Sequence, residues 1–454
     1  MNKKQLLSTV ALSLALTGVS YAAVNQEQAA ELGQSLTPLG AEMGANADGS
    51  IPAWTGGITT PPAGYTVGDH HPDPYAADKV LYTVTAANAK DYDALLTDGQ
   101  KALFAAYPDT FKMQVYPTQR SASVPQYIYD GTKANATRAE LIDGGNGIVG
   151  AGAGIPFPIP SNGLEAIWNH IFRFRGVDVT RFAGQAAPMP SGNYTYIRFR
   201  EAIKFISSGE DITPEKLSET NMVFMFKQAV TQPASLAGTA LLVHETMDQV
   251  KQPRNAWTFN ASTRRPRRAP TVAYDHPGTA ADGLRTTDDY DMYNGSPNRY
   301  NWSLVGKQEL LIPYNTYKLH SDELTNDDIL KPGHINPDVV RYEKHRVWVV
   351  EANLKDGISH IYKKRRYYID EDSWQIAVAD LYDSREQLYR VAMSHAINYY
   401  EVPALWSTLE VFHDLQARRY IAIGLDNQEK MYDFSKPLSE KDFTSRALVK
   451  EAKR

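Results

Sequence analysis

Several short patterns in the chain resemble sites for phosphate binding or nucleophilic chemistry. Residues 145–150 read GNGIVG, the glycine spacing that holds a dinucleotide phosphate when a strand precedes it and a helix follows it. Pro156, Pro158 and Pro160 come next and prevent such a helix. We therefore predict that residues 144–160 form a mobile, mildly apolar flap that could gate a cavity. The chain contains no GK[ST] phosphate loop and no GxSxG nucleophile elbow.

Three further patterns resemble metal sites only in part. Residues 244–248 begin an HExxH zinc motif but carry aspartate where the second histidine is required. Residues 289–295 resemble a calcium loop, yet a tyrosine replaces one ligand and the glycine falls one place late. Residues 70–73 (HHPD) offer metal ligands, although loop histidines are more often simply solvated. No carboxylate pair stands out as an acid–base pair, so we expect no enzyme activity, no metal and no cofactor.

The most informative stretch, residues 257–270, reads WTFNASTRRPRRAP. Trp257 and Phe259 alternate with small or polar neighbours, which is typical of a half-buried strand. The strand runs into four arginines in a chain whose formal net charge is −5, which argues against a general nucleic-acid binder. A solvated turn would explain the cluster, and so would a docking site for anionic lipid head groups or an acidic partner. The arginines that we assign to head-group or partner contact are Arg264, Arg265, Arg267 and Arg268.

The N-terminus carries the pattern of a secretory signal. Lys3 and Lys4 precede an apolar run over residues 6–19, and residues 20–22 supply the small residues that a signal peptidase reads. The run is too short to span the roughly 30 Å of a membrane, so we expect cleavage after Ala22 and export to the periplasm. The absence of cysteine excludes a cysteine-linked lipid anchor, disulfides and thiolate metal sites. No later run is long and apolar enough to cross a membrane.

Beyond the signal peptide, residues 1–22, the composition divides the chain into two parts. Residues 23–125 contain many proline and glycine turns and are predicted to form an extended N-terminal arm with two short helices. One helix is expected near residues 86–96, and the next begins at Thr97, whose capping box pairs with Gln100. Residues 126–454 are predicted to form the main, mostly β domain.

The clearest helix signal covers residues 161–176. Apolar residues recur there at helical spacing, so that Trp168 and Phe172 fall on one stripe. Asn162 and Glu165 provide an N-cap and its partner, and Gly176 is placed to end the helix. We expect the aromatic stripe of this helix to lie against a sheet.

Most of the chain after Gly192 reads as strands. Short turns between successive strands predict antiparallel neighbours. Basic residues at 363–366 interrupt the apolar side, so one face of the sheet is expected to be wet. The predicted strands are 193–206, 222–230, 241–250, 256–260, 346–354, 358–369, 374–383, 386–400, 407–414 and 419–424.

Aromatic side chains make up 11% of the chain. Most of them are expected to be ordinary core, but a strongly curved sheet has more concave surface than its own side chains can fill. Leftover apolar concavity is a ligand site by default, in which each buried CH₂ of an acyl or sterol-like ligand contributes about 0.8 kcal/mol. The candidates for its lining are Trp168, Phe172, Trp257, Phe259, Trp302, Trp348 and Trp374.

Long segments of the chain resemble the DUF1329 family of Gram-negative periplasmic proteins, which is grouped with LolA/LolB-like outer-membrane lipoprotein-sorting proteins. The strand that runs into the arginines resembles a corner of the LolA-like proteins. The resemblance implies an α+β, mostly antiparallel fold, in which a large curved sheet forms a half-barrel with helices on its concave face. The matching segments are 47–57 (ADGSIPAWTGG), 106–120, 264–277, 293–310, 341–354 and 365–383 (RRYYIDEDSWQIAVADLYD).

The resemblance also implies a function. It indicates a soluble periplasmic carrier or chaperone that binds a hydrophobic ligand, such as a lipid, a sterol-like molecule or lipoprotein acyl chains, for transfer across the envelope. It implies an inner-membrane proton-driven exporter and an outer-membrane β-barrel protein as partners, and it carries over no catalytic residue. A non-catalytic scaffold of an envelope complex and a secreted carbohydrate-binding protein are the alternatives that the sequence leaves open.

Overall fold

A computed structural model describes residues 24–260, 265–269, 272 and 274–452. The predicted signal peptide, residues 1–22, lies outside the described residues, as does Arg264. Within the described ranges, no helix has both the length and the apolar character that a membrane crossing requires.

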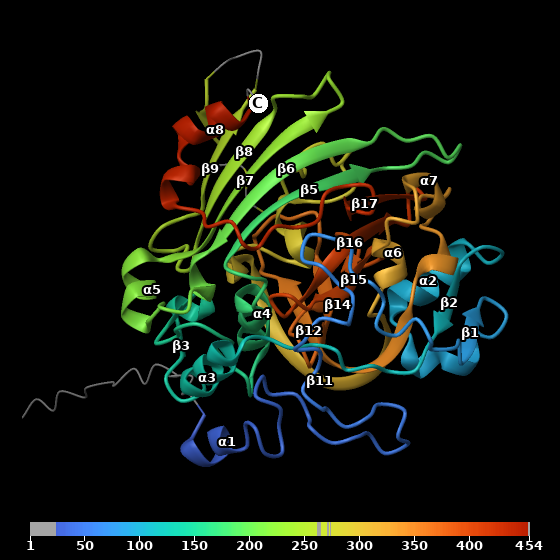
Figure 1. Ribbon diagram of the computed structural model, residues 1–454, viewed down its shortest axis with the longest axis horizontal. Helices are drawn as coiled ribbons and strands as arrows, with labels where there is room; N and C mark the ends of the chain where they lie inside the picture. The colour runs from blue at the N-terminus through green and yellow to red at the C-terminus, as the bar shows by residue number, and fades with distance from the viewer. Residues whose placement is uncertain (1–23, 261–264, 270–271, 273, 453–454) are drawn as a thin grey trace, which may run out of the picture.

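One 15-stranded sheet dominates the molecule and curves around its centre (Figure 1). A separate two-stranded sheet, β3 (Glu140–Ile142) with β4 (Gly147–Val149), lies outside it. The strands of the large sheet are β1 (Tyr82–Thr85), β2 (Lys112–Val115), β5 (Asp178–Ala186), β6 (Ile197–Phe205), β7 (Met222–Gln232), β8 (Ala240–Thr246), β9 (Asn255–Phe259), β10 (Arg267–Arg268), β11 (Tyr300–Pro313), β12 (Tyr342–Leu354), β13 (Lys364–Asp370), β14 (Ile376–Tyr382), β15 (Leu388–Tyr399), β16 (Ala404–Asp414) and β17 (Arg419–Leu425).

The sheet is open and mostly antiparallel. Its order is β1-β2-β12-β13-β14-β15-β16-β17-β5-β6-β7-β8-β9-β10, with β11 paired to β12 off this path. The junction of β2 with β12 is parallel, and the other neighbouring pairs are antiparallel. The two ends of the order do not pair with each other, so the strands form a curved half-barrel. The predicted fold class is therefore confirmed.

All ten predicted strands occur, as β6 to β9 and β12 to β17, but two long strands were missed. β5 was hidden because glycine and polar residues break its apolar pattern. β11 was missed because most of its first ten residues are exposed or half-buried. Its pairing with β12 over 13 positions, rather than its own hydrophobicity, fixes it as a strand.

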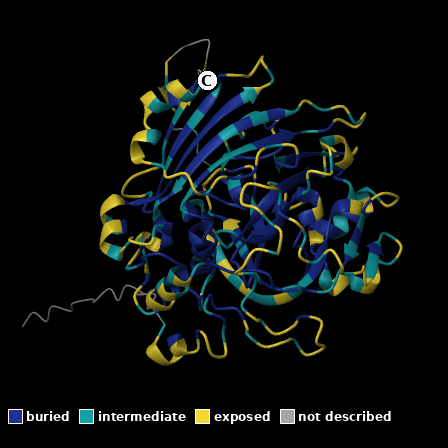
Figure 2. Cartoon of the chain, viewed as in Figure 1, coloured by how far each residue is buried: buried dark blue, intermediate teal, exposed yellow. Residues whose placement is uncertain are grey.

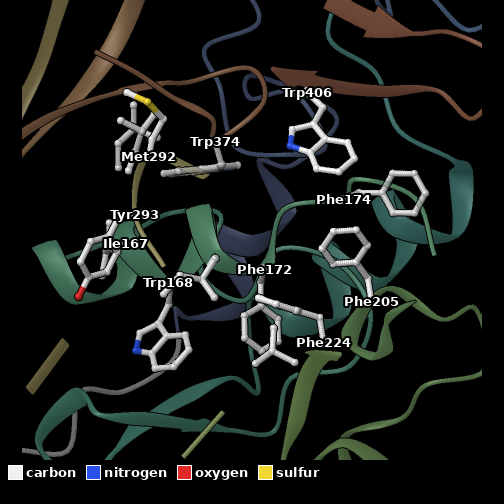
Figure 3. Close-up of a cluster of buried hydrophobic side chains, with 14 of the residues drawn as sticks. Ile167, Trp168, Phe172, Phe174, Phe205, Phe224, Met292, Tyr293, Trp374 and Trp406 are labelled. Carbon is white, nitrogen blue, oxygen red and sulfur yellow. The ribbon is translucent and has the colours of Figure 1, made fainter. Parts of the chain in front are cut away.

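The concave side of the sheet is filled by α4 (Gly163–Phe172). The side chain of Asn162 accepts a hydrogen bond from the amide of Glu165 at 3.0 Å, as the predicted N-cap requires. Trp168 and Phe172 join the sheet residue Phe224 in one buried cluster (Figure 3). The helix ends at Phe172 rather than at Gly176, because the next residues turn away to place their guanidinium groups in an internal ion cluster.

Residues 144–160 do not form a flap over a cavity. Residues 151–158 are buried, and they pack inside the curve beside α4 and α3 (Gln126–Asn135). Asn135 donates from its side chain to backbone carbonyls of this segment, and Asn169 exchanges two hydrogen bonds with the backbone of Phe157. The buried glycines and prolines therefore serve close packing, which the sequence alone did not reveal.

The N-terminal arm covers the convex side of the sheet. It contains η1 (Ala89–Leu95) and α2 (Asp98–Ala106), and Thr97 forms the predicted capping box with Gln100. Apolar residues between Val84 and Ala122 share a core with β12 to β17, whereas Leu39 and Val124 belong to the core on the concave side. A Cβ on Gly99 would lie 2.6 Å from a methyl group of Val391, which shows how closely α2 approaches β15.

The expectation of a wet sheet face is wrong for the central strands. Every residue of β14 and β16 is buried, because the arm covers one face and α4 with its neighbours covers the other (Figure 2). Arg365, taken as a marker of the wet face, is fully buried. The remaining helices are α1 (Gln26–Ala30), α5 (Pro214–Thr220), α6 (Tyr317–His320), α7 (Asn326–Ile329) and α8 (Ser445–Ala452), and the last packs over β7 to β9 (Figure 1).

Asp380 connects the arm to the sheet beneath α2. Its carboxylate accepts hydrogen bonds from the amide of Gly99 at 3.1 Å, the hydroxyl of Thr97 at 3.3 Å and the hydroxyl of Tyr368 at 3.1 Å. Burial raises its pKa to about 7 in spite of these donors. The folded state therefore favours the protonated carboxyl group.

Asp380→Asn is expected to change how stability depends on pH. An unfolded aspartate has a pKa of about 3.9, so the wild-type protein loses stability as the pH rises from about 4 to about 7, whereas asparagine does not titrate. Relative to the wild type, the free energy of unfolding of the variant should therefore be roughly 1 to 3 kcal/mol higher at pH 8 than at pH 4.5. Thermal unfolding at both pH values measures this, with Asp356→Asn in an exposed turn as the control. An Asp380→Asn effect that is equal at both pH values would contradict it.

Candidate ligand-binding cavity

A cavity of about 310 Å³ lies between the concave face of β7 to β9 and a loop, of which residue 272 and residues 274–294 are described. The strands contribute Phe224, Phe226, Leu241 and Val243 to its wall, and the loop contributes both Tyr290 and polar or charged groups such as Arg285. This volume is in the range of small-molecule sites in proteins, which are mostly apolar with a few polar groups. The cavity is therefore the candidate functional site.

Strand alternation explains which side chains reach the cavity. Phe224, Phe226 and Gln228 lie two residues apart on β7 and so share one face. The register continues this face across the sheet, since Gln228 pairs with Leu241 and Leu241 pairs with Thr258. The intervening residues of the three strands point to the other face, where they pack against α8.

Buried ion pairs hold the loop that closes the cavity. Asp288 binds Arg365 at 2.6 Å, and Asp291 binds Arg173 at 2.5 Å and also Arg175. The partners come from β13 and from the residues that follow α4, so they fix the loop to two separate parts of the fold. The segment that resembles a calcium loop in sequence thus carries carboxylates that arginines already neutralise.

The arginines also determine the charge state of these carboxylates. Burial alone would raise the pKa of Asp288 and Asp291, but the adjacent guanidinium groups hold both values well below the usual range. The indole N–H of Trp406 donates to Asp291 at 3.2 Å. Both groups are therefore ionised at neutral pH and anchor the segment that carries Tyr290.

Two basic side chains line the cavity wall in different ways. Arg254 forms an ion pair with Glu245 at 2.7 Å, and both side chains are buried. Arg285 also lines a smaller pocket of about 30 Å³ that contains Glu410. Burial, followed by the charge of Asp291, raises the pKa of Glu410 to about 7.

None of the seven aromatic residues assigned to the ligand lining faces this cavity. Trp168 and Phe172 fill the core beside α4, and Trp302 stacks on Tyr367. Trp348 and Trp374 stack on each other with ring centroids 6.2 Å apart. The side chains that do not line the cavity are Trp168, Phe172, Trp257, Phe259, Trp302, Trp348 and Trp374.

The arginine stretch forms the free edge of the sheet beside the cavity. Arg265 is exposed, and Arg267 and Arg268 of β10 pair with Thr258 and Trp257 of β9. Directly paired residues point to the same face, so Arg267 lies on the cavity side, whereas Arg268 lies over the ring of Trp257 on the other side. Contact of these arginines with head groups or a partner stays a prediction.

One group of described residues brings metal-ligating atoms together, namely His345, Asp370 and Asp372, whose ligand atoms lie within 4.8 Å of one another. Arg120 already forms two hydrogen bonds with Asp372, at 2.9 and 2.6 Å. The Nε2–H of His345 donates a hydrogen bond to the carboxylate of Glu343 at 3.0 Å. We assign these residues to the docking of the N-terminal arm.

The histidines of residues 70–73 were expected to be solvated, but one of them lies in the protein interior. His71 is buried, where it contacts Glu401 at 2.8 Å and the ring of His320 at 3.0 Å. These partners lie more than 200 positions away in the sequence, so no local pattern indicated them.

Sequence reasoning missed the residues that form the cavity, for two reasons. Phe224 and Phe226 gave the correct alternating strand signal, but nothing local showed that their face is the one left unfilled. Arg285 and Tyr290 lie in a loop whose position depends on distant ion pairs. The acidic run at residues 288–291 was the available signal, because so many carboxylates in a mostly buried protein need cationic partners.

Asp291→Asn is expected to destabilise the protein by about 3 to 5 kcal/mol, because it leaves two buried arginines without a counter-charge. Asparagine preserves the size of the side chain and tolerates the positive φ of 53° at this position. Urea or thermal unfolding measures the loss. Asp282→Asn in the same loop is the matched control, since its ion pair with Arg419 is largely exposed and worth at most about 1 kcal/mol. Equal losses in the two variants would count against the anchoring role.

Comparison with known proteins shows the family to which the chain belongs. Residues 83–449 match the family model described as protein of unknown function (DUF1329). The uncharacterized protein PA3922 of Pseudomonas aeruginosa is 52% identical over 453 residues, which is 99% of each chain. Among solved structures, a putative outer membrane lipoprotein-sorting protein domain from Vibrio parahaemolyticus is 14% identical, with a TM-score of 0.44 over 63% of this chain and 98% of that one. A DUF1329 family protein from Desulfovibrio piger is also 14% identical, with a TM-score of 0.41 over 60% of this chain and 92% of that one. The protein therefore belongs to the DUF1329 family.

Proposed function

We propose that the protein is a periplasmic, non-catalytic carrier that binds a hydrophobic molecule in the cavity under β7 to β9. The observation that carries this proposal is a hollow of about 310 Å³ walled by Phe224, Phe226, Leu241 and Val243. A well-packed protein interior leaves few voids larger than one water molecule. The apolar side chains of β7 and β8 on one wall, with polar groups such as Arg254 and Arg285 on the others, are the arrangement of a site for a hydrophobic molecule that carries a polar group.

Burial of apolar surface supplies the affinity in this proposal. Each CH₂ group moved from water into the cavity contributes about 0.8 kcal/mol, and the affinity is what remains after the cost of association is subtracted. The preformed wall adds to this, because the ion pairs of Asp288 and Asp291 fix it before the ligand arrives.

Periplasmic location and transfer partners are part of the proposal. The signal pattern of residues 1–22 supports export. The basic edge at Arg265, Arg267 and Arg268 supports contact with an anionic membrane surface or acidic partner. An inner-membrane exporter and an outer-membrane β-barrel protein remain the partners that we expect from the family resemblance.

The proposal is tested by native mass spectrometry of protein purified without detergent, followed by organic extraction. We expect a co-purified lipophile, or uptake of one after incubation with phospholipid vesicles and re-isolation of the protein. Protein that carries no lipophile and takes up none from the vesicles would contradict a carrier function.

Filling the cavity should block binding. Leu241→Trp places an indole in the space that the ligand would occupy, so the affinity for the neutral probe N-phenyl-1-naphthylamine should fall by about tenfold or more. Fluorescence titration measures the change. Leu236→Trp, in the exposed turn after β7, makes the same substitution outside the cavity and should bind the probe as the wild type does. Unchanged binding in Leu241→Trp would place the probe elsewhere.

A further inference from the structure

Arg285 is a buried cation that forms no direct ion pair with any of the described residues. Its side chain belongs to a residue that is only 8% exposed, yet no carboxylate of the described residues lies within 4 Å of its guanidinium group. Its Nη1 reaches the carbonyl of Thr286 at 3.4 Å, and its Nε has no hydrogen-bond partner. Buried charges are normally paired, so this group has unused capacity to bind an anion.

The guanidinium group lies at the cavity rather than elsewhere in the core. Arg285 lines both the cavity and the adjoining smaller pocket. A Cβ built on Gly278, another residue of the cavity wall, would lie 3.1 Å from the guanidinium carbon. The glycine therefore leaves the space in which the cation sits beside the apolar wall.

Arg254 in the cavity wall and Arg181 in the adjoining smaller pocket already have partners. Arg254 pairs with Glu245 at 2.7 Å, and Arg181 pairs with Glu201 at 2.6 Å. Behind the wall, two arginines share the single carboxylate of Asp291. None of these carboxylates is left to neutralise Arg285.

Glu410 is the remaining carboxyl group of this region, and it does not balance the charge fully. It lies in the smaller pocket, where Ser407 donates a hydrogen bond to it at 3.1 Å. Burial and then the charge of Asp291 raise its pKa to about 7, whereas the nearby charge of Arg285 lowers it. Five guanidinium groups thus lie near four carboxyl groups, and three of these carboxyl groups already pair with the other four arginines.

We propose that Arg285 anchors the anionic head group of a single-chain amphiphile whose hydrocarbon chain occupies the cavity. The head group is a carboxylate or a phosphate monoester, because a guanidinium fork binds both in a bidentate manner. This inference rests on the proposed carrier function and adds to it the chemical class of the ligand. It also accounts for a buried cation whose charge Glu410 balances only in part.

The test compares three ligands that share a twelve-carbon chain, namely dodecanoate, dodecyl phosphate and dodecan-1-ol. Each displaces N-phenyl-1-naphthylamine from the wild-type protein at neutral pH and low salt. At least one anion should bind about tenfold or more tightly than the alcohol, as expected of a hydrogen bond to a charged group. The stronger of the two anions identifies the head group as a fatty-acid carboxylate or a phosphate ester.

Arg285→Gln should remove this preference while leaving the affinity for dodecan-1-ol within about twofold of the wild type. Arg285→Lys should keep part of it, because it retains the charge but not the fork. Arg385→Gln, in an exposed turn, is the matched control and should keep the full preference. Melting temperatures of the variants verify folding, and Arg285 has no ion pair whose loss would unfold the protein.

The outcomes separate the two proposals. Equal binding of all three ligands by the wild type, or a preference that survives in Arg285→Gln, would overturn the anchor role and leave the carrier function standing. Failure of the wild type to bind the neutral probe and all three ligands would overturn the carrier function itself.

Discussion

The concave side of the sheet depends on buried carboxylates held by arginines. Asp291 connects the end of α4 with β16 through Arg173, Arg175 and Trp406, and Asp288 connects the same short segment with Arg365 on β13. Removing such ions from water costs several kcal/mol each unless their partners are well placed. Since those partners lie on separate elements, one position of the segment satisfies all of them, and that position forms a wall of the cavity.

The same network sustains backbone strain in the cavity wall. Asp291 and Met292 have positive φ values of 53° and 66°, and a methionine rarely adopts this conformation. Such residues persist only where the surrounding contacts fix them. Here the ion pairs on one side and the burial of Met292 on the other do so. The sharp turn brings Tyr290 and Asn294 to the cavity while the carboxylates point away into the core.

Local signals in the sequence predicted much of the fold but little of the site. The capping boxes, the amphipathic α4 and the alternating strands each depend on neighbouring residues, and so they were readable. The wet face was predicted wrongly because Arg365 is charged, although a buried Asp288 neutralises it. Tryptophans were natural candidates for a cavity, yet their size makes them the side chains that fill a core, as Trp374 does. Which concave surface stays unfilled depends on long-range packing.

The position of the cavity follows from how unevenly the sheet is covered. The arm and α4 pack against the two faces of β12 to β16, so that half of the sheet has no spare volume. The strands β7 to β9 have α8 on one face, but on the other they have a loop held mainly through its acidic end. This loop leaves the cavity beside it unfilled, whereas the apolar stripe of α4 fills the space against the sheet. The hollow therefore lies where the coverage changes from helix to loop, next to the sheet edge where Arg267 points to the same face.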